Sequence, residues 1–184
     1  MASQCNTLHL SLEMASERER IKGEFHRLGP NINLHYTSSR HPNNPLTLRL
    51  YENGKPGDED CLFLTAVRWV NLMKSDTIVR HAEQCIRAGD SFYLKQHIGG
   101  GLYLKMRSPR TDIKLVILSL NPSTLEKKHE MTMTLVQWTR MKNIFDEMSC
   151  RYHSLIMPLK PCVDADSHKN ANSYFACYEC NPFE

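Results

Sequence analysis

The sequence predicts an α+β protein with two tandem modules, each a curved antiparallel sheet of about four strands followed by one helix. The main observation is an internal repeat: the chain's two tryptophans, Trp69 and Trp138, each belong to a T-x-V-x-W motif. Each motif follows a short apolar stretch and opens a segment with apolar residues at helical intervals. The threonine of each motif suits a helix N-cap, because its hydroxyl can accept a hydrogen bond from an unpaired backbone N–H.

The composition is that of a globular protein. The chain has 184 residues, 41% hydrophobic and 23% charged, which suits one domain or two small modules that share a core. The net charge of +3 is mild and does not by itself demand nucleic acid. No apolar stretch approaches the ~20 residues that a membrane helix needs, so we expect no membrane partner.

The cysteine count and the N-terminus favour a reducing, intracellular compartment. Seven cysteines is an odd number, whereas a secreted disulfide framework is usually even and dispersed. The first residues lack both a basic region and a continuous apolar stretch, so we expect no secretion signal.

The first module is predicted from alternating apolar and polar residues. In Leu46–Tyr51 the three leucines share one side of a strand, and Thr47, Arg49 and Tyr51 share the other. Asp76 or Gly89-Asp90 is expected to end or interrupt the helix that starts near Ala66. After a lead-in over residues 1–24, the first module spans 25–90, with strands over 32–36, 46–51 and 61–64.

The second module repeats this order over residues 91–155. The shift that places Trp69 on Trp138, applied without gaps, also places Leu46-Thr47-Leu48 on Leu115-Val116-Ile117. A Gly99-Gly100-Gly101 bend follows a lead-in at Phe92–Leu94. Strands are expected over 102–106, 113–120 and 131–133, then a helix from Leu135; the tail, 156–184, is rich in proline and asparagine and has no periodicity.

The second module resembles the positive-cofactor-four family of single-stranded-DNA-binding transcriptional coactivators. The segment GLYLKMRSPRTDIKLVILSL (101–120), followed by MTMTLVQWTRMKNIFDEM (131–148), carries the resemblance. It contains an aromatic-led strand with Tyr103, an arginine leaving that strand at Arg107, a basic turn with Arg110, a long apolar strand, and a helix that opens with Thr-x-x-x-Trp. The first module matches less closely, through Phe25, Gly29, Tyr36, Arg40, Leu46–Tyr51 and Thr65–Trp69.

The resemblance implies a pseudo-dimer within one chain. Members of the family form a four-stranded sheet and one helix per subunit, and two subunits pair through their helices to make the DNA-binding surface. This chain would carry both halves in tandem, with further dimerisation left open. It departs from the family at Pro42 and Pro109, which stand where an aromatic residue and lysines are usual, and at Leu120, which replaces an aromatic residue. The nucleic-acid surface is therefore expected to be weakened or unequal between the modules.

Single-stranded nucleic acid needs cations for its phosphates and aromatic faces for its bases. Alternation places Arg49 with Tyr51, and Tyr103 with Lys105, on the same side of their strands. The competing interpretation is that these residues are the ordinary solvated face of antiparallel sheets. The candidate nucleic-acid-binding residues are Arg40, His41, Arg49, Tyr51, Tyr103, Lys105, Arg107, Arg110 and Lys114.

The tail and the end of the second helix offer ligands for a zinc site. Cys150 and His153 form a Cys-x-x-His pair, and Cys177 and Cys180 form a Cys-x-x-Cys pair, which are ligand types that tetrahedral zinc uses. The alternative is that these are incidental free cysteines, with Cys150 and His153 inside the second helix. Apart from this zinc, no cofactor is expected.

Two functions follow from these patterns. The first is a non-enzymatic protein that binds single-stranded or melted DNA in the nucleus and acts in transcription or replication, with proteins of those processes as further partners. The second is a regulatory protein-interaction module of the same fold with a degenerate DNA surface and a zinc-held tail. No catalytic motif or paired carboxylate site is present, so an enzyme is not predicted, and both tryptophans are assigned to the core.

Overall fold

The structure is a computed structural model, and it describes residues 23–39, 45–52, 61–107, 114–121 and 124–159. The first module contains β1 (Glu24–Arg27), β2 (Ile32–Ser38), β3 (Leu46–Glu52), β4 (Cys61–Thr65), α2 (Ala66–Lys74) and α3 (Asp76–Arg87). The second contains β5 (Tyr93–Gly99), β6 (Leu102–Arg107), β7 (Lys114–Leu120), β8 (Lys127–Thr134), α4 (Leu135–Arg151) and α5 (His153–Ile156).

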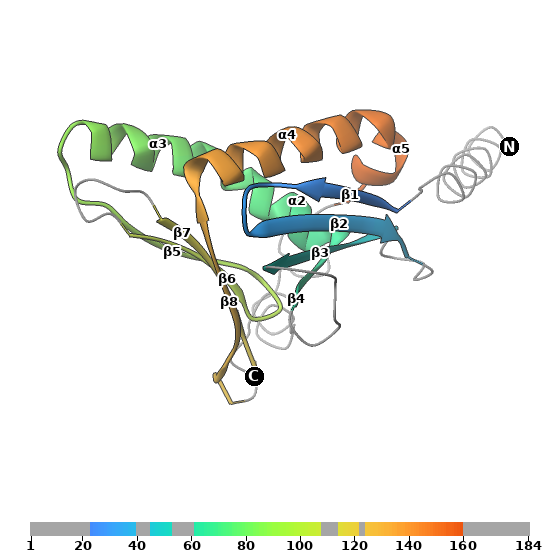
Figure 1. The fold of residues 1–184 in the computed structure, drawn as a ribbon, viewed down its shortest axis with the longest axis horizontal. Helices are drawn as coiled ribbons and strands as arrows, with labels where there is room; N and C mark the ends of the chain where they lie inside the picture. The colour runs from blue at the N-terminus through green and yellow to red at the C-terminus, as the bar shows by residue number, and fades with distance from the viewer. Residues whose placement is uncertain (1–22, 40–44, 53–60, 108–113, 122–123, 160–184) are drawn as a thin grey trace, which may run out of the picture.

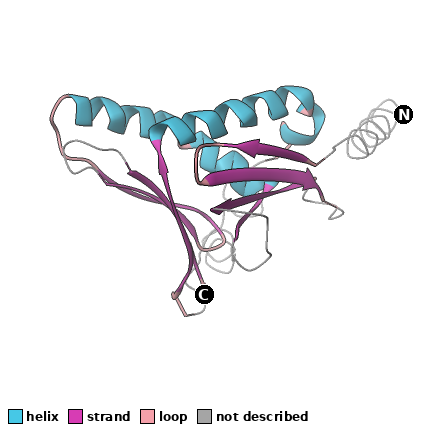
Figure 2. Cartoon of the chain, viewed as in Figure 1, coloured by secondary structure: helices cyan, strands magenta, loops and turns pink. Residues whose placement is uncertain are grey.

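Each module forms its own four-stranded sheet. The strands pair antiparallel with their neighbours in chain order, β1-β2-β3-β4 in one sheet and β5-β6-β7-β8 in the other. Helices follow each sheet, and in Figure 1 α3, α4 and α5 run along one edge of the molecule with both sheets on the other side. Figure 2 shows the same division between helices and strands. The predicted α+β fold with two tandem sheet-plus-helix modules is confirmed.

Both predicted N-caps are present. The hydroxyl of Thr65 accepts a hydrogen bond from the backbone N–H of Arg68 at 3.3 Å, and that of Thr134 accepts one from Gln137 at 3.3 Å. The Thr134 backbone N–H also donates to the Gln137 side-chain oxygen at 2.8 Å, which completes a capping box. The repeat therefore marks the start of the helical part of each module.

The core lies between the helices and the inner face of each sheet. Alternation places Leu34, Leu48 and Leu64 on the inner face of the first sheet, and all three are fully buried. Trp69 and Trp138 are also fully buried, as predicted. Large aromatic side chains remove the most apolar surface from water, so these two positions anchor the helices to the sheets.

The helical part of the first module is broken at Ser75, next to the predicted interruption at Asp76. The Ser75 hydroxyl is buried and donates to Gln96 Oε1 on β5 at 3.1 Å. This contact ties the break to the second sheet. The segment before the glycine bend also differs from expectation, since Tyr93–Gly99 is a complete strand rather than a lead-in. The bend itself contains Gly100 and Gly101, both with positive φ.

The gapless alignment of the two modules is wrong in the third strand. Thr65 pairs with Thr47, so the gapless shift would pair Thr134 with Val116, but Thr134 pairs with Lys114 instead. The β7–β8 hairpin also contains a register shift between Ser119 and Leu120, as a bulge produces. Leu48 pairs with the residue just before the cap Thr65, and Leu115 pairs with the residue just before the cap Thr134, so Leu48 corresponds to Leu115.

Two equivalent hydrogen bonds connect the modules, each from a helix of one module to the first-strand region of the other. Asn71 on α2 donates to the Ile98 carbonyl at 2.5 Å, near the end of the first strand of the other module. Arg140 on α4 donates to the Leu28 carbonyl at 2.9 Å, just after the first strand of the first module. The shift that places Trp69 on Trp138 also places Asn71 on Arg140, so equivalent helix positions reach equivalent parts of the opposite sheet.

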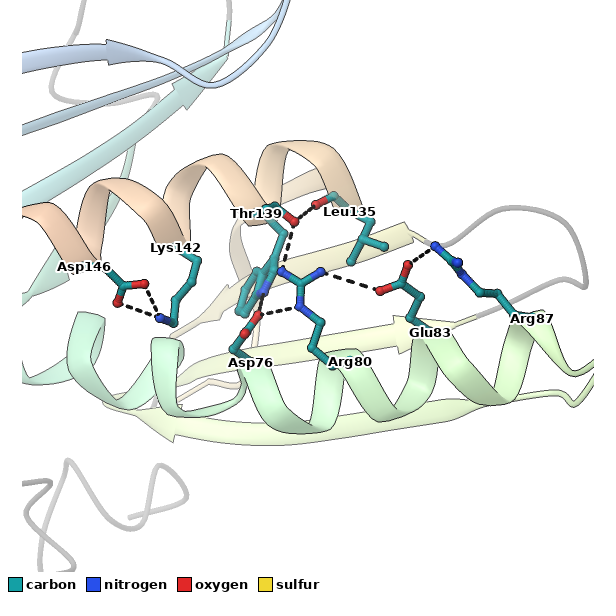
Figure 3. Close-up of polar contacts among 9 residues, drawn as sticks. Asp76, Arg80, Glu83, Arg87, Leu135, Thr139, Lys142 and Asp146 are labelled. Atoms are coloured by element: carbon teal, nitrogen blue, oxygen red, sulfur yellow. Dashed lines mark hydrogen bonds and ion pairs between the residues drawn. The ribbon is translucent and has the colours of Figure 1, made fainter.

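The helices of the two modules also contact each other, and Figure 3 shows the polar part of this contact. Trp138 Nε1 donates to Asp76 Oδ1 at 2.7 Å, and the Trp69 ring meets the Phe145 ring edge-on at 5.2 Å between centroids. Trp69 comes before Asp76 in the chain, yet it contacts Phe145, which comes after Trp138 on α4. The two helical segments therefore run in opposite directions at this contact.

Candidate nucleic-acid interface

A row of four side chains crosses the outer face of the first sheet. The strand register pairs Phe25 with His35, His35 with Arg49, and Arg49 with Phe63. These positions alternate with the buried inner-face residues, so their side chains lie on the opposite face. Phe25 is 57% exposed and Phe63 43% exposed, so the row ends in an accessible ring on each side.

Tyr51 does not offer an open ring beside this row. It is only 2% exposed, and the Phe25 ring lies 5.8 Å from it between centroids. Its hydroxyl has no hydrogen-bond partner among the described residues, and burial raises its pKa. The prediction that Tyr51 presents a face for base stacking is therefore corrected: Phe25, not Tyr51, is the accessible ring at this end of the sheet.

The outer face of the second sheet is more cationic. Lys95 pairs with Lys105, and Tyr93 lies in the neighbouring row, which continues through Arg107 to Lys114. Tyr93 is 68% exposed, and Lys114 is also exposed. This sheet thus combines one accessible ring with several lysines, whereas the row on the first sheet has two accessible rings and one arginine.

Tyr103 also requires a correction. It lies on the outer face as predicted but is only 4% exposed, with the His97 ring 5.2 Å away between centroids. The Lys95 ammonium sits 4.8 Å from the centre of the Tyr103 ring, a cation–π geometry. Tyr103 is therefore better placed to orient Lys95 than to stack on a base, and burial raises the pKa of its hydroxyl.

Several predicted site residues fall outside the part of the chain that the structure describes. Arg40, His41 and Arg110 are among them, as are Cys177 and Cys180. The backbone of Arg107 lies in β6, but its side chain is outside the described part. Lys105 is half-buried on β6, and Arg49 is half-buried on β3.

The described half of the predicted zinc set is exposed. Cys150 lies in α4 and His153 begins α5, so a change of helix separates them. Among the residues that the structure describes, no group of three or more His, Cys, Asp or Glu side chains could hold a metal ion.

The sequence interpretation did not select Phe25, His35, Phe63, Tyr93 or Lys95 for the site. Phe63 lies within the apolar stretch Cys61–Leu64, where a core position is the usual expectation. Its outward direction follows from the pairing with Arg49, which requires the register of the β3–β4 hairpin. The other members of the row likewise follow from the pairing of β1 with β2 and of β2 with β3.

The electrostatic setting of His35 yields a testable pH dependence. Burial, and then the nearby Arg49 guanidinium, lower the pKa of His35 below its usual 6.5. The folded protein therefore holds a neutral imidazole at pH values where the unfolded chain is already protonated. This contribution to stability is present above pH 6.5 and is lost as the pH falls from 6.5 through the lowered pKa.

An NMR titration of the His35 ring should give a midpoint below 6.5, and Arg49→Gln should move that midpoint upward. The variant removes one of the two causes and leaves the burial in place. A wild-type midpoint at or above 6.5 would contradict this description of the outer face.

Neither a protein-family model nor a curated protein matches the chain. Within the described residues, no helix has the length and apolar character needed to cross a membrane.

Proposed function

We propose that this chain is a non-enzymatic protein that binds single-stranded nucleic acid on the outer faces of its two sheets. The observation that carries the proposal is the row of Phe25, His35, Arg49 and Phe63 across the first sheet. A single strand exposes both base faces and phosphates. The row offers two accessible rings for bases and a guanidinium for a phosphate between them.

The preference for single strands follows from the aromatic ends of the row. Phe25 and Phe63 stand out from a sheet surface, and a ring in this position stacks on a base only if the base is not already stacked in a duplex. The second sheet, with Lys95, Lys105 and Lys114, would contribute phosphate contacts. Such a protein would act on melted DNA during transcription or replication, in the nucleus.

We further propose that the two modules form a pseudo-dimer through their helices. The reciprocal pair of hydrogen bonds, Asn71 to Ile98 and Arg140 to Leu28, supports this proposal. The two tryptophan contacts, Trp69 with Phe145 and Trp138 with Asp76, support it as well. In a two-fold contact, when one residue meets a second, the equivalent of the first meets the equivalent of the second. Trp138 is the equivalent of Trp69 and Asp76 is the equivalent of Phe145, so the two tryptophan contacts follow this rule.

The proposed function is tested by fluorescence anisotropy of a labelled single-stranded oligonucleotide over a series of salt concentrations. We expect the affinity to fall with salt, because each neutralised phosphate adds about −0.7 to the slope of log K against log salt. Lys114→Gln should reduce the magnitude of that slope by about 0.7 for the one phosphate contact that it removes.

A charge-matched control is Lys142→Gln. Lys142 lies on α4 and pairs with Asp146 at 2.6 Å, away from the sheet faces, so its loss should leave the slope unchanged. Binding that ignores salt, equal affinity for an intact duplex, or equal effects of the two lysine variants would each overturn the proposal.

The second candidate is a regulatory protein-interaction module. The exposed rings Phe25, Phe63 and Tyr93 favour it, because exposed apolar groups on a polar surface can also dock a protein. A zinc ion held by Cys150, His153, Cys177 and Cys180 would belong to this candidate and stays a prediction. It requires no oligonucleotide binding and about one zinc per chain, which elemental analysis of protein purified without added metal would measure.

A further inference from the structure

His35 stands inside the row on the first sheet, between Phe25 on β1 and Arg49 on β3. The rings of Phe25 and His35 lie 6.5 Å apart between centroids. The imidazole also lies close to Gly23, because a Cβ built on that glycine would be 3.1 Å from His35 Nε2. The imidazole therefore occupies a place on the outer face that the absent side chain of Gly23 leaves open.

The imidazole is available to a ligand on this face. His35 is half-buried, and no hydrogen bond or ion pair joins its ring to another residue that the structure describes. Neither ring nitrogen is enclosed as an unsatisfied buried atom. Both nitrogens of a protonated imidazole are donors, so the ring can donate to an acceptor such as a phosphate oxygen.

The charged and titratable groups that face His35 are two arginines and one tyrosine. Arg49 faces it directly from β3, and Tyr51 lies diagonally on the same strand. Arg27 lies diagonally on β1, with its guanidinium bonded to carbonyl oxygens of the β1–β2 turn. No carboxylate occupies an outer-face position next to His35 in the described parts of β1, β2 and β3. A proton on the ring therefore has positive neighbours in the free protein, and a phosphate would supply the opposite charge.

This setting disfavours the protonated ring until a ligand arrives. Burial, and then the Arg49 guanidinium, lower the pKa of His35 below its usual 6.5, so the ring is mostly neutral at neutral pH. Arg49 stays charged over this pH range, whichever contact it makes within the chain. A phosphate beside the ring would favour the imidazolium and raise the pKa of His35. A strand that reaches His35 is therefore held more tightly when the ring is protonated.

The second sheet carries a permanent charge at the equivalent position. With the helix caps and strand pairing aligned, Arg49 corresponds to Val116. Their partners on the preceding strand are His35 and Lys105, so these two residues are equivalent. Lysine stays charged up to about pH 10, whereas histidine changes its charge near neutral pH. Protonation of His35 thus gives the first sheet a charge that the second sheet has throughout this pH range.

From this placement we propose that His35 is a proton-dependent phosphate contact, so that binding of a single strand on the first sheet is coupled to uptake of a proton by the imidazole. The inference rests on the proposed function and adds regulation to it. The proton moves from the medium to a ring nitrogen, whose N–H then donates to a phosphate oxygen. The first sheet binds a strand more tightly as the pH falls, and the equivalent lysine of the second sheet does not respond.

The test is the anisotropy titration with a labelled single-stranded oligonucleotide at about pH 7.5 and about pH 5.5, on either side of the usual pKa of histidine. We expect the wild type to bind about fivefold to tenfold more tightly at the lower pH, as a difference of about 1 between the pKa of His35 in the free and the bound protein requires. The salt slope should steepen by up to about 0.7 at the lower pH, because one more phosphate is neutralised. His35→Gln should lose both changes, and His35→Lys should bind tightly at both pH values.

Two matched variants make the result specific. Lys105→Gln removes the charge at the equivalent position, so it should weaken binding by the same factor at both pH values. His81 lies on α3 in the helical layer, and His81→Gln should leave the pH effect as in the wild type. His35→Lys keeps the test decisive if His35→Gln disturbs the fold, because a pH effect that persists with lysine at this position would overturn the proposal.

The outcomes separate this inference from the proposed function. Oligonucleotide binding with the same pH effect in the wild type and in His35→Gln would overturn the proton-dependent contact and leave the proposed function standing. No oligonucleotide binding at either pH would overturn the proposed function and the contact with it. An independent measurement is the NMR titration of the His35 ring at saturating oligonucleotide, where the midpoint should lie above that of the free protein. A midpoint that does not move would overturn the contact as well.

Discussion

Replacing Trp138 by alanine is expected to lower the free energy of unfolding by about 3–5 kcal/mol, the usual cost of removing a large buried aromatic side chain. Trp138 is fully buried at the start of α4, and its indole N–H donates to Asp76 of the other module. The variant would therefore open a cavity and remove a contact between the modules. Urea unfolding followed by circular dichroism measures the loss, which is a large share of the total stability of a domain.

The two tryptophans should respond differently to a milder change. Trp138→Phe leaves the Asp76 carboxylate without its indole donor, whereas Trp69 Nε1 has no hydrogen-bond partner among the described residues. The position equivalent to Asp76 is Phe145, whose ring packs against Trp69 instead. We therefore expect Trp138→Phe to cost about 1–3 kcal/mol more than Trp69→Phe. Equal losses, or a larger loss at Trp69, would contradict the unequal contacts described for the two modules.

Replacing Phe25 and Phe63 together by alanine should weaken binding of a single-stranded oligonucleotide by about 2–6 kcal/mol, since each stacked base contributes about 1–3 kcal/mol. Phe25 is 57% exposed and Phe63 43% exposed on the outer face of the sheet, so neither belongs to the buried core and the folded structure should survive the change. Anisotropy titration at one salt concentration measures the loss, and the salt slope should stay as in the wild type because no charge is removed.

Val136→Ala is the matched control for the two phenylalanine changes. Val136 is an exposed apolar residue at 62% exposure, but it lies on α4 rather than on a sheet face. Its removal should leave the affinity unchanged. If the double phenylalanine variant also binds as tightly as the wild type, the aromatic row does not contact bases.

The parts of the fold that local patterns determine could be predicted from the sequence. Alternation in Leu46–Tyr51 gave a strand with the correct buried face, because each leucine of that segment is fully buried. The threonines at positions 65 and 134 gave both helix starts, since an N-cap depends on a few neighbouring residues. The repeat of these signals gave the two modules.

The parts that depend on pairing between strands could not be predicted. Tyr51 and Tyr103 point outward as alternation requires, yet neighbouring side chains cover both. That coverage depends on which residue of the adjacent strand stands beside each ring. The row from Phe25 to Phe63 likewise requires the register of four strands, and the different pairing of the β7–β8 hairpin appears only once the register is known.

Whether the outer faces of the sheets bind nucleic acid can be measured by mapping backbone amide NMR shifts during titration with a single-stranded oligothymidylate. We expect the changes to centre on the outer-face positions of the first sheet, including Phe25, Arg49 and Phe63, and to extend to Lys105 and Lys114 on the second. Signals from α3, which lies in the helical layer, should stay in place. Changes confined to the helices, or no changes at saturating oligonucleotide, would contradict binding on the outer faces.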